Sequence, residues 1–112
     1  MKKIEAIVRE DRFHLIKLAL EEKGFFSMTV SEVMGRGKQK GVAVKWRVGE
    51  HRIGFLPKKK IEMIVEEKDC QTVADIICDR GRTGAMGDGK IFILPVEEVV
   101  RIRTGDRGKE AV

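Results

Sequence analysis

The chain has 112 residues, of which 42% are hydrophobic and 37% are charged, and its formal net charge is +5. This length suits one domain and this composition suits a globular fold. No apolar run approaches the ~20 residues that a membrane-spanning helix needs, and the first residues lack the apolar core of a signal peptide. We therefore expect a single domain over residues 1–112 and a cytoplasmic location.

Positive charge is concentrated in the middle of the chain. From Arg36 to Lys60 there are nine Lys or Arg residues against one acid, Glu50, so this segment carries +8 and the remainder carries −3. Such a polarised segment favours an anionic ligand or an anionic partner surface. The alternative is a solvated loop whose lysines serve solubility.

The first half of the chain alternates between strand and helix patterns. Lys3–Val8 is predicted to be a strand, and Asp11 is expected to cap the helix that Gly24 ends. Phe26–Met34 alternates as a second strand. A connection of roughly 20 residues without a clear period follows, where a hairpin would need about 2–5. Loops of this length are usually functional or disordered.

The second half repeats the pattern. A strand over 60–65 precedes a helix that Asp69 caps and Gly81 closes, and strands over 90–96 and 99–103 follow. The helix carries both cysteines, eight residues apart, which is about 12 Å along its axis and too far for a disulfide. Two strand-helix-strand units predict an α+β, ferredoxin-like double βαβ fold with an antiparallel sheet and both helices on one face.

The glycine-rich segment Thr83-Gly84-Ala85-Met86-Gly87-Asp88-Gly89-Lys90 is the first candidate site. It nearly fits the Walker A spacing, but Ile91 replaces the required Ser or Thr, and the helix precedes the segment instead of following it. Closely spaced glycines can still turn backbone N–H groups toward an anion, and Lys90 adds charge. The alternative is a plain turn between helix and strand.

Two further segments have the chemistry of anion binding. On a short strand, Arg101 and Arg103 would project to the same side and suit a phosphate between them; the alternative is a pair of surface arginines matched by nearby acids. At the root of the long connection, the glycines of 35–41 allow close backbone approach, and Gln39 offers an oxygen for a metal ion.

Taken together, these segments resemble the PII family of nitrogen-signalling proteins over essentially the whole chain. The resemblance rests on Met1-Lys2-Lys3-Ile4-Glu5-Ala6-Ile7, Gly37-Lys38-Gln39-Lys40-Gly41, Phe55-Leu56-Pro57-Lys58, Thr83 to Phe92, and Arg101-Ile102-Arg103-Thr104-Gly105. It implies a homotrimer that binds ATP or ADP, Mg²⁺ and 2-oxoglutarate in clefts between neighbours. In it Gln39 would ligate the Mg²⁺ and Lys58 would pair with 2-oxoglutarate. The residues it implies for ligand binding are Thr29, Gly35, Gly37, Lys38, Gln39, Lys40, Gly41, Lys58, Glu62, Ile64, Gly87, Asp88, Gly89, Lys90, Arg101 and Arg103.

The resemblance also assigns the long connection, about residues 37–55, to the T-loop with which the family docks on target proteins, and about residues 104–112 to a C-terminal tail. The expected partner-binding residues are Lys45, Trp46, Arg47 and His51. An ammonium transporter, nitrogenase or glutamine synthetase is the candidate target. The sequence of residues 35–41 resembles that of the nitrogenase-linked branch.

Three positions depart from the family pattern. Lys38 stands where Arg is usual, which leaves the preference between ATP and ADP open. His51 and Gly49 replace the modifiable tyrosine and serine of other branches, so uridylylation or phosphorylation at those positions is excluded.

No catalytic constellation is visible, so we expect a sensor and not an enzyme. One alternative is a basic ferredoxin-like RNA-binding domain, although such domains stack bases on strand aromatics, and this chain has five Phe, one Trp and no Tyr. A nucleotide-metabolising enzyme is the other.

Overall fold

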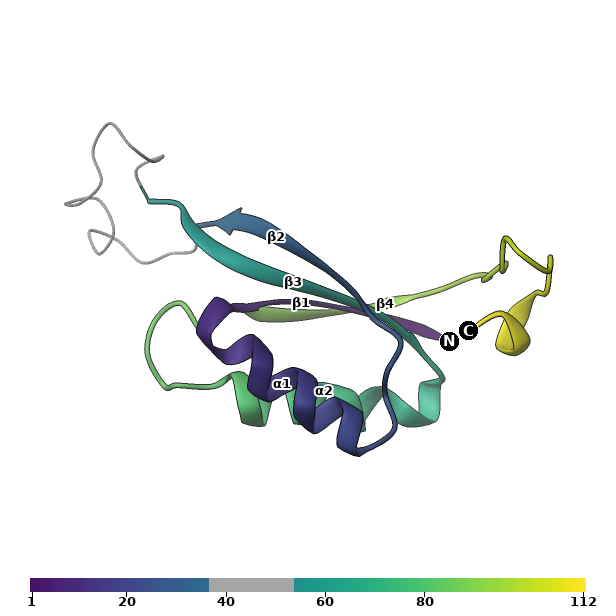
Figure 1. Ribbon diagram of the computed structural model, residues 1–112, viewed down its shortest axis with the longest axis horizontal. Coiled ribbons are helices and arrows are strands. Elements are labelled where there is room, and N and C mark those ends of the chain that lie inside the picture. Colours follow the sequence, from purple (N-terminus) through teal and green to yellow (C-terminus); the bar gives the residue numbers. More distant parts are fainter. Residues whose placement is uncertain (37–53) are drawn as a thin grey trace.

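The computed structural model describes residues 1–36 and 54–112, and its elements follow the predicted strand-helix-strand order twice. The elements are β1 (Lys2–Arg9), α1 (Glu10–Glu22), β2 (Thr29–Gly35), β3 (Leu56–Val65), α2 (Glu67–Gly81), β4 (Lys90–Pro95) and the 3₁₀ turn η1 (Gly108–Ala111). The strands form one sheet in the order β2-β3-β1-β4, and each neighbouring pair is antiparallel. Both helices cover the same face of it (Figure 1). The ferredoxin-like fold is therefore confirmed.

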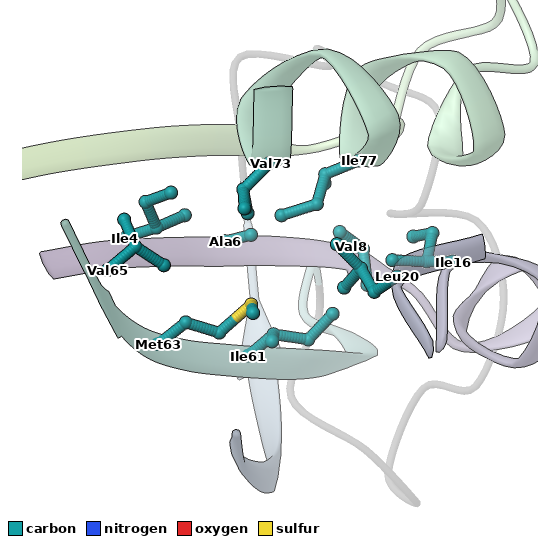
Figure 2. Packing of buried hydrophobic residues seen from close by; sticks show 10 residues of the cluster. All are labelled: Ile4, Ala6, Val8, Ile16, Leu20, Ile61, Met63, Val65, Val73 and Ile77. Atoms are coloured by element: carbon teal, nitrogen blue, oxygen red, sulfur yellow. The ribbon is translucent and has the colours of Figure 1, made fainter. Parts of the chain in front are cut away.

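The core lies between the sheet and the two helices because the central strands alternate in polarity. In β1, Ile4, Ala6 and Val8 are buried, whereas the residues between them face the side without helices. Figure 2 shows these side chains meeting those of β3 and the helices. The buried cluster consists of Ile4, Ala6, Val8, Ile16, Leu20, Ile61, Met63, Val65, Val73 and Ile77.

The end of α1 is set by a glycine that accepts a left-handed backbone. Gly24 has φ +86°, and its N–H donates to the Glu21 carbonyl at 3.0 Å. The N–H of Phe25 then donates to the Leu20 carbonyl at 2.9 Å, and Phe25 packs against the core. This is a Schellman arrangement, which turns the chain toward β2.

Several predicted boundaries were displaced. Asp11 and Asp69 lie in the first turns of their helices, where acids favour the helix dipole, and neither is the cap. Strand β2 begins at Thr29 instead of Phe26. Strand β3 begins at Leu56, four residues before the predicted start, because pairing with β2 extends it through a lysine run that shows no apolar alternation.

The predicted strand over 99–103 was wrong. Only one isolated bridge forms there, between Val100 and Arg107. Gly105, with φ +75°, donates to the Arg101 carbonyl at 2.7 Å, and Arg101 donates its N–H to the Asp106 carbonyl at 2.9 Å. The glycine therefore reverses the chain where alternation alone predicted an extended segment.

Two further sequence expectations bear on the described residues. Cys70 and Cys78 are both free thiols. Neither helix in the described ranges has the length and apolar character to cross a bilayer.

Candidate functional site

The segment over residues 82–89, which we call the glycine turn, connects α2 to β4 and packs on the end of β1. Gly84, Gly87 and Gly89 all have positive φ. A Cβ on Gly89 would lie 1.8 Å from the Ile7 carbonyl oxygen, so no side chain fits there. The turn therefore packs against the backbone of β1 at a distance that only glycine allows.

Asp88 organises the glycine turn from within. Its carboxylate accepts hydrogen bonds from the Thr83 N–H at 2.9 Å, the Thr83 hydroxyl at 2.5 Å and the Gly84 N–H at 2.9 Å. Arg9 Nε donates to it as well, at 2.8 Å. The Thr83 hydroxyl and then Arg9 hold the pKa of Asp88 well below its usual range. Asp88 is therefore ionised at neutral pH, and its oxygens face the turn.

Lys58 on β3 is a buried cation beside this turn. Its side chain is 8% exposed, and its ammonium donates to the Gly87 carbonyl at 2.5 Å. Burial lowers the pKa of Lys58 and repulsion from Arg9 lowers it further, while Asp88 and Asp11 act in the opposite direction. Gly35 on β2 adjoins the lysine stem, because a Cβ there would lie 3.4 Å from Lys58 Cγ. The structure thus brings Gly35, Lys58 and Gly87 together.

A solvent-open hollow of about 320 Å³ lies where α2 meets the glycine turn. Asp88, Gly89 and Lys90, which the sequence singled out, are among its lining residues. The others come from β1, β4, the C-terminal part of α2 and the first residue of the glycine turn, and they are Ile7, Val8, Ile77, Cys78, Gly81, Arg82 and Ile91. Apolar walls with a few polar groups at one edge are common in small-molecule sites.

A second group of predicted residues lies on the open face of the sheet, away from the helices. Thr29 and Glu62 are register partners on β2 and β3, and Ile64 follows on the same face. Glu62 pairs with Lys3 at 2.7 Å, and the hydrogen bond from Lys3 lowers the pKa of Glu62. On the same face, Phe92 of β4 is the register partner of Glu5 and is 48% exposed.

The third group is the arginine pair of the C-terminal reversal. Arg101 Nη1 lies 3.7 Å from an Asp106 oxygen, which is one of the acids that the alternative interpretation expected. Arg101 Nη2 also donates to the Val112 carbonyl at 3.4 Å. Arg103 is exposed, and Ile102 between them is 99% exposed.

These groups lie at different ends of the chain's sheet. Lys90 pairs with Ile7 at one end of β4, whereas Pro95 pairs with Lys2 at the other, about 17 Å away for five strand residues. The glycine turn joins the first end and the arginine pair follows the second, as Figure 1 shows in green and yellow. A single chain therefore does not bring Gly87 and Arg103 together.

The remaining predicted residues fall outside the described ranges. They are Gly37, Lys38, Gln39, Lys40, Gly41, Lys45, Trp46, Arg47 and His51. Within residues 1–36 and 54–112, no three His, Cys, Asp or Glu side chains gather as a metal site of their own.

Sequence reasoning missed Arg9, which contacts the glycine turn from the end of β1. Its Nη2 donates to the Met86 carbonyl, in addition to the bond from Nε to Asp88. Its partners are 77 and 79 residues away in sequence. The one available signal was a charged residue closing an apolar strand, and that pattern alone is too common to identify a site.

Comparison with known proteins gives a consistent result. Residues 1–106 match the sequence profile of the family described as "Nitrogen regulatory protein P-II". The chain is 51% identical over 112 residues to "Nitrogen regulatory protein P-II 2" of Methanothermobacter thermautotrophicus, covering all of this chain and 97% of the relative. It is also 51% identical to "Nitrogen regulatory protein P-II" of Microchaete diplosiphon, with both chains covered in full.

A solved structure supports the same assignment. The crystal structure of Arabidopsis thaliana PII bound to citrate superposes with a TM-score of 0.80 and 40% identity, covering 99% of this chain and 91% of that one. On the profile, the full-length relatives and the shared fold, the chain belongs to the nitrogen regulatory protein P-II family.

Proposed function

We propose that this protein is a non-enzymatic, cytoplasmic signal transducer that binds ATP or ADP together with Mg²⁺ and 2-oxoglutarate and controls a target protein. The observation that carries the proposal is the buried ammonium of Lys58 beside a turn whose glycines have positive φ. Burial of a cation is costly unless a partner compensates it, and a ligand carboxylate would do so. Membership of a family of nitrogen regulators gives this site its biological setting.

The nucleotide would be held between two protomers of a homotrimer. One protomer would supply Gly35, Gly87, Asp88, Gly89 and Lys90, and its neighbour would supply Thr29, Glu62, Ile64, Arg101 and Arg103. The separation of these groups along β4 supports this division, because one chain cannot close the site alone. The uncovered sheet face, on which Phe92 and Leu94 are 48% and 41% exposed, supports association through that face.

The carboxylate effector would occupy the region next to Lys58. Its ammonium would pair with one carboxylate of 2-oxoglutarate, and Gln39 would ligate Mg²⁺ together with the phosphates and the effector. The backbone of residues 37–41, including Lys38 and Lys40, would complete the contacts. That the Arabidopsis thaliana relative was crystallised with citrate, another carboxylate, supports the ligand class.

Target control would pass through residues 37–55, with Lys45, Trp46, Arg47 and His51 as the contact residues. An ammonium transporter, nitrogenase or glutamine synthetase is the proposed class of target. Deleting residues 40–52 should abolish capture of the target while ADP binding through residues 82–90 persists. Unchanged target capture by the deleted protein would place the interface elsewhere.

Isothermal titration calorimetry tests the ligand assignment directly. The purified protein should bind ADP and ATP, and it should take up 2-oxoglutarate only when Mg-ATP is present, because the metal and phosphates complete that site. Equal 2-oxoglutarate uptake with and without Mg-ATP would contradict the ordering. A monomeric preparation that ignores adenine nucleotides would overturn the function.

The RNA-binding alternative loses support from the arrangement of the sheet. Proteins of that class stack bases on aromatic side chains of the two central strands. Here the central strands are β1 and β3. By strand alternation, the open-face positions of β1 and β3 are Lys3, Glu5, Ile7, Arg9, Leu56, Lys58, Lys60, Glu62 and Ile64, and none is aromatic.

A further inference from the structure

Arg9 fastens the glycine turn to the sheet at two separate points. Its Nε donates to Asp88 Oδ1 at 2.8 Å, and its Nη2 donates to the Met86 carbonyl at 2.5 Å. The same Nη2 would lie 3.3 Å from a Cβ placed on Gly87. One rigid guanidinium therefore grips the turn on both sides of Gly87, and a single-point cation could not do so.

The contact with Asp88 extends this grip through the turn. The Asp88 carboxylate receives the amides of Thr83 and Gly84 and the Thr83 hydroxyl, so its oxygens are occupied by donors of the protein itself. The Thr83 hydroxyl in turn accepts the N–H of Ala85 at 3.1 Å. Asp88 is thus an internal anchor of the turn, and its negative charge is balanced by Arg9.

Arg9 also faces Lys58 across the β1–β3 ladder, where the two are register partners. Lys58 Nζ lies 3.4 Å from the position that a Gly87 Cβ would take, close to Arg9 Nη2. Asp88 is bound to Arg9, and the ammonium of Lys58 donates to the neutral Gly87 carbonyl.

We propose that Arg9 is a positioning residue for the nucleotide site: acting through Asp88, it holds the backbone of residues 83–89 in the shape that receives the phosphates. The proposal rests on the proposed function, because it assumes that the glycine turn binds phosphate. Arg9 itself contacts the turn and need not touch the ligand. Its contribution is to hold the turn in its phosphate-binding shape before the ligand arrives.

A double-mutant cycle on ADP affinity tests this role. Arg9→Gln and Asp88→Asn should each weaken ADP binding by about tenfold, the usual effect of losing a charge-assisted hydrogen bond that orders a site. Because the two residues act as a unit, the double variant should also lose about tenfold. A loss of about a hundredfold in the double variant, meaning independent effects, would overturn the proposal.

Two companion variants separate positioning from simple stabilisation. Arg9→Lys keeps the positive charge and perturbs the fold little, but an ammonium cannot hold the turn at two points. Its ADP affinity should therefore fall nearly as far as that of Arg9→Gln. Arg12→Gln removes a similar bond, from Arg12 Nε to the Arg80 carbonyl at 2.8 Å, away from the turn, and should leave ADP affinity unchanged. Wild-type affinity in Arg9→Lys, or a loss in Arg12→Gln equal to that in Arg9→Gln, would assign Arg9 a structural role only.

Amide hydrogen exchange distinguishes failure of this inference from failure of the function. In Arg9→Gln the Gly84 N–H should exchange faster than in wild type while core amides such as that of Ile61 keep their protection. If wild type binds ADP and Arg9→Gln binds it equally well, the positioning role is wrong and the function stands. If wild type does not bind ADP at all, the proposed function fails first and the inference fails with it.

Discussion

Lys58 shows how one side chain can be prepared for a ligand. Its stem is buried against Gly35, its ammonium is desolvated, and Arg9 stands near it. Both burial and Arg9 lower the pKa of Lys58, so the cation is held at a cost that an incoming carboxylate would relieve. The charge of this residue, more than its size, should therefore determine effector binding.

Replacing Lys58 with Met tests this point. The variant keeps an unbranched stem of similar length but has no ammonium, so 2-oxoglutarate affinity in the presence of Mg-ATP should fall at least about 100-fold, while ADP still binds. Titration calorimetry measures both. Lys59→Met is the matched control, since Lys59 points away and pairs with Glu32 at 2.8 Å. Normal 2-oxoglutarate uptake by Lys58→Met would remove Lys58 from the site.

Gly89 offers a second test at this scale. An alanine there combines a φ of +95° with a Cβ 1.8 Å from the Ile7 carbonyl oxygen, and the backbone must move. We expect the free energy of unfolding to fall by about 3 kcal/mol, measured by urea denaturation. Gly84→Ala, at φ +89° but with nothing within 4 Å, should cost only about 1 kcal/mol. Equal losses in the two variants would show that the close approach to β1 is unimportant.

Individual residues differed in how far the sequence could predict them. Glycine spacing indicated an irregular backbone at residues 84–89, and the positive φ values follow from the same chemistry. Arg9 could not be predicted, because its partners Asp88 and Met86 become neighbours only once β1 and β4 are paired. Contacts that depend on the register of distant strands leave no local pattern.

At the scale of elements, the stability that the glycine turn gives the fold should depend on pH through Asp88. The folded-state pKa of Asp88 lies well below the ~3.9 of an unfolded aspartate, so the stability it contributes is complete above about pH 5. As pH falls below about 4, the unfolded chain takes up the proton first, and that stability is lost.

An acid titration of unfolding free energies checks this expectation. Asp88→Asn should be less stable than wild type at pH 7, and the difference should shrink below pH 4. Asp79→Asn, at an exposed helical position where the nearest partner is Arg80 at 3.5 Å, should show no such convergence. A difference between Asp88→Asn and wild type that stays constant down to pH 2 would contradict the role given to Asp88.

The elements themselves were predictable where packing follows a simple period. The buried alternation of Ile4, Ala6 and Val8 and the apolar face of α2 are visible in the sequence and appear in the core. The early start of β3 was not, because Lys58 and its neighbours are placed by pairing with β2 and not by burial on alternate positions. The reversal at Gly105 was missed because Val100 and Ile102, which flank Arg101, give the alternation that is typical of a strand.

At the scale of the whole molecule, the two ends of the sheet carry different groups. The glycine turn stands at one end and the arginine pair beyond the other, with β4 between them. A surface at one end that must meet a different surface at the opposite end produces a head-to-tail contact, and such contacts form a ring when the rotation between neighbouring subunits closes. The proposed trimer is an assembly of this kind.

Complementation between defective protomers tests this division of the site. Lys90→Ala should disable one side of each nucleotide site and Arg103→Ala the other, so that either variant alone binds ADP poorly. When the two are unfolded together and refolded as a random mixture, about a quarter of the sites should combine two intact sides and recover normal affinity. Equilibrium dialysis measures the recovered stoichiometry. No recovery would mean that both sides come from the same chain.

The placement of the glycine turn and the arginine pair at opposite ends of the sheet carries a genetic consequence. If each nucleotide site is formed by surfaces of two different subunits, a mutation in one of these surfaces disables one site per mutant subunit. The other surface of that subunit stays functional. In a cell that expresses both alleles, functional clefts would then decline in direct proportion to the dose of the damaged allele, without the steeper loss expected when one bad copy inactivates a whole ring.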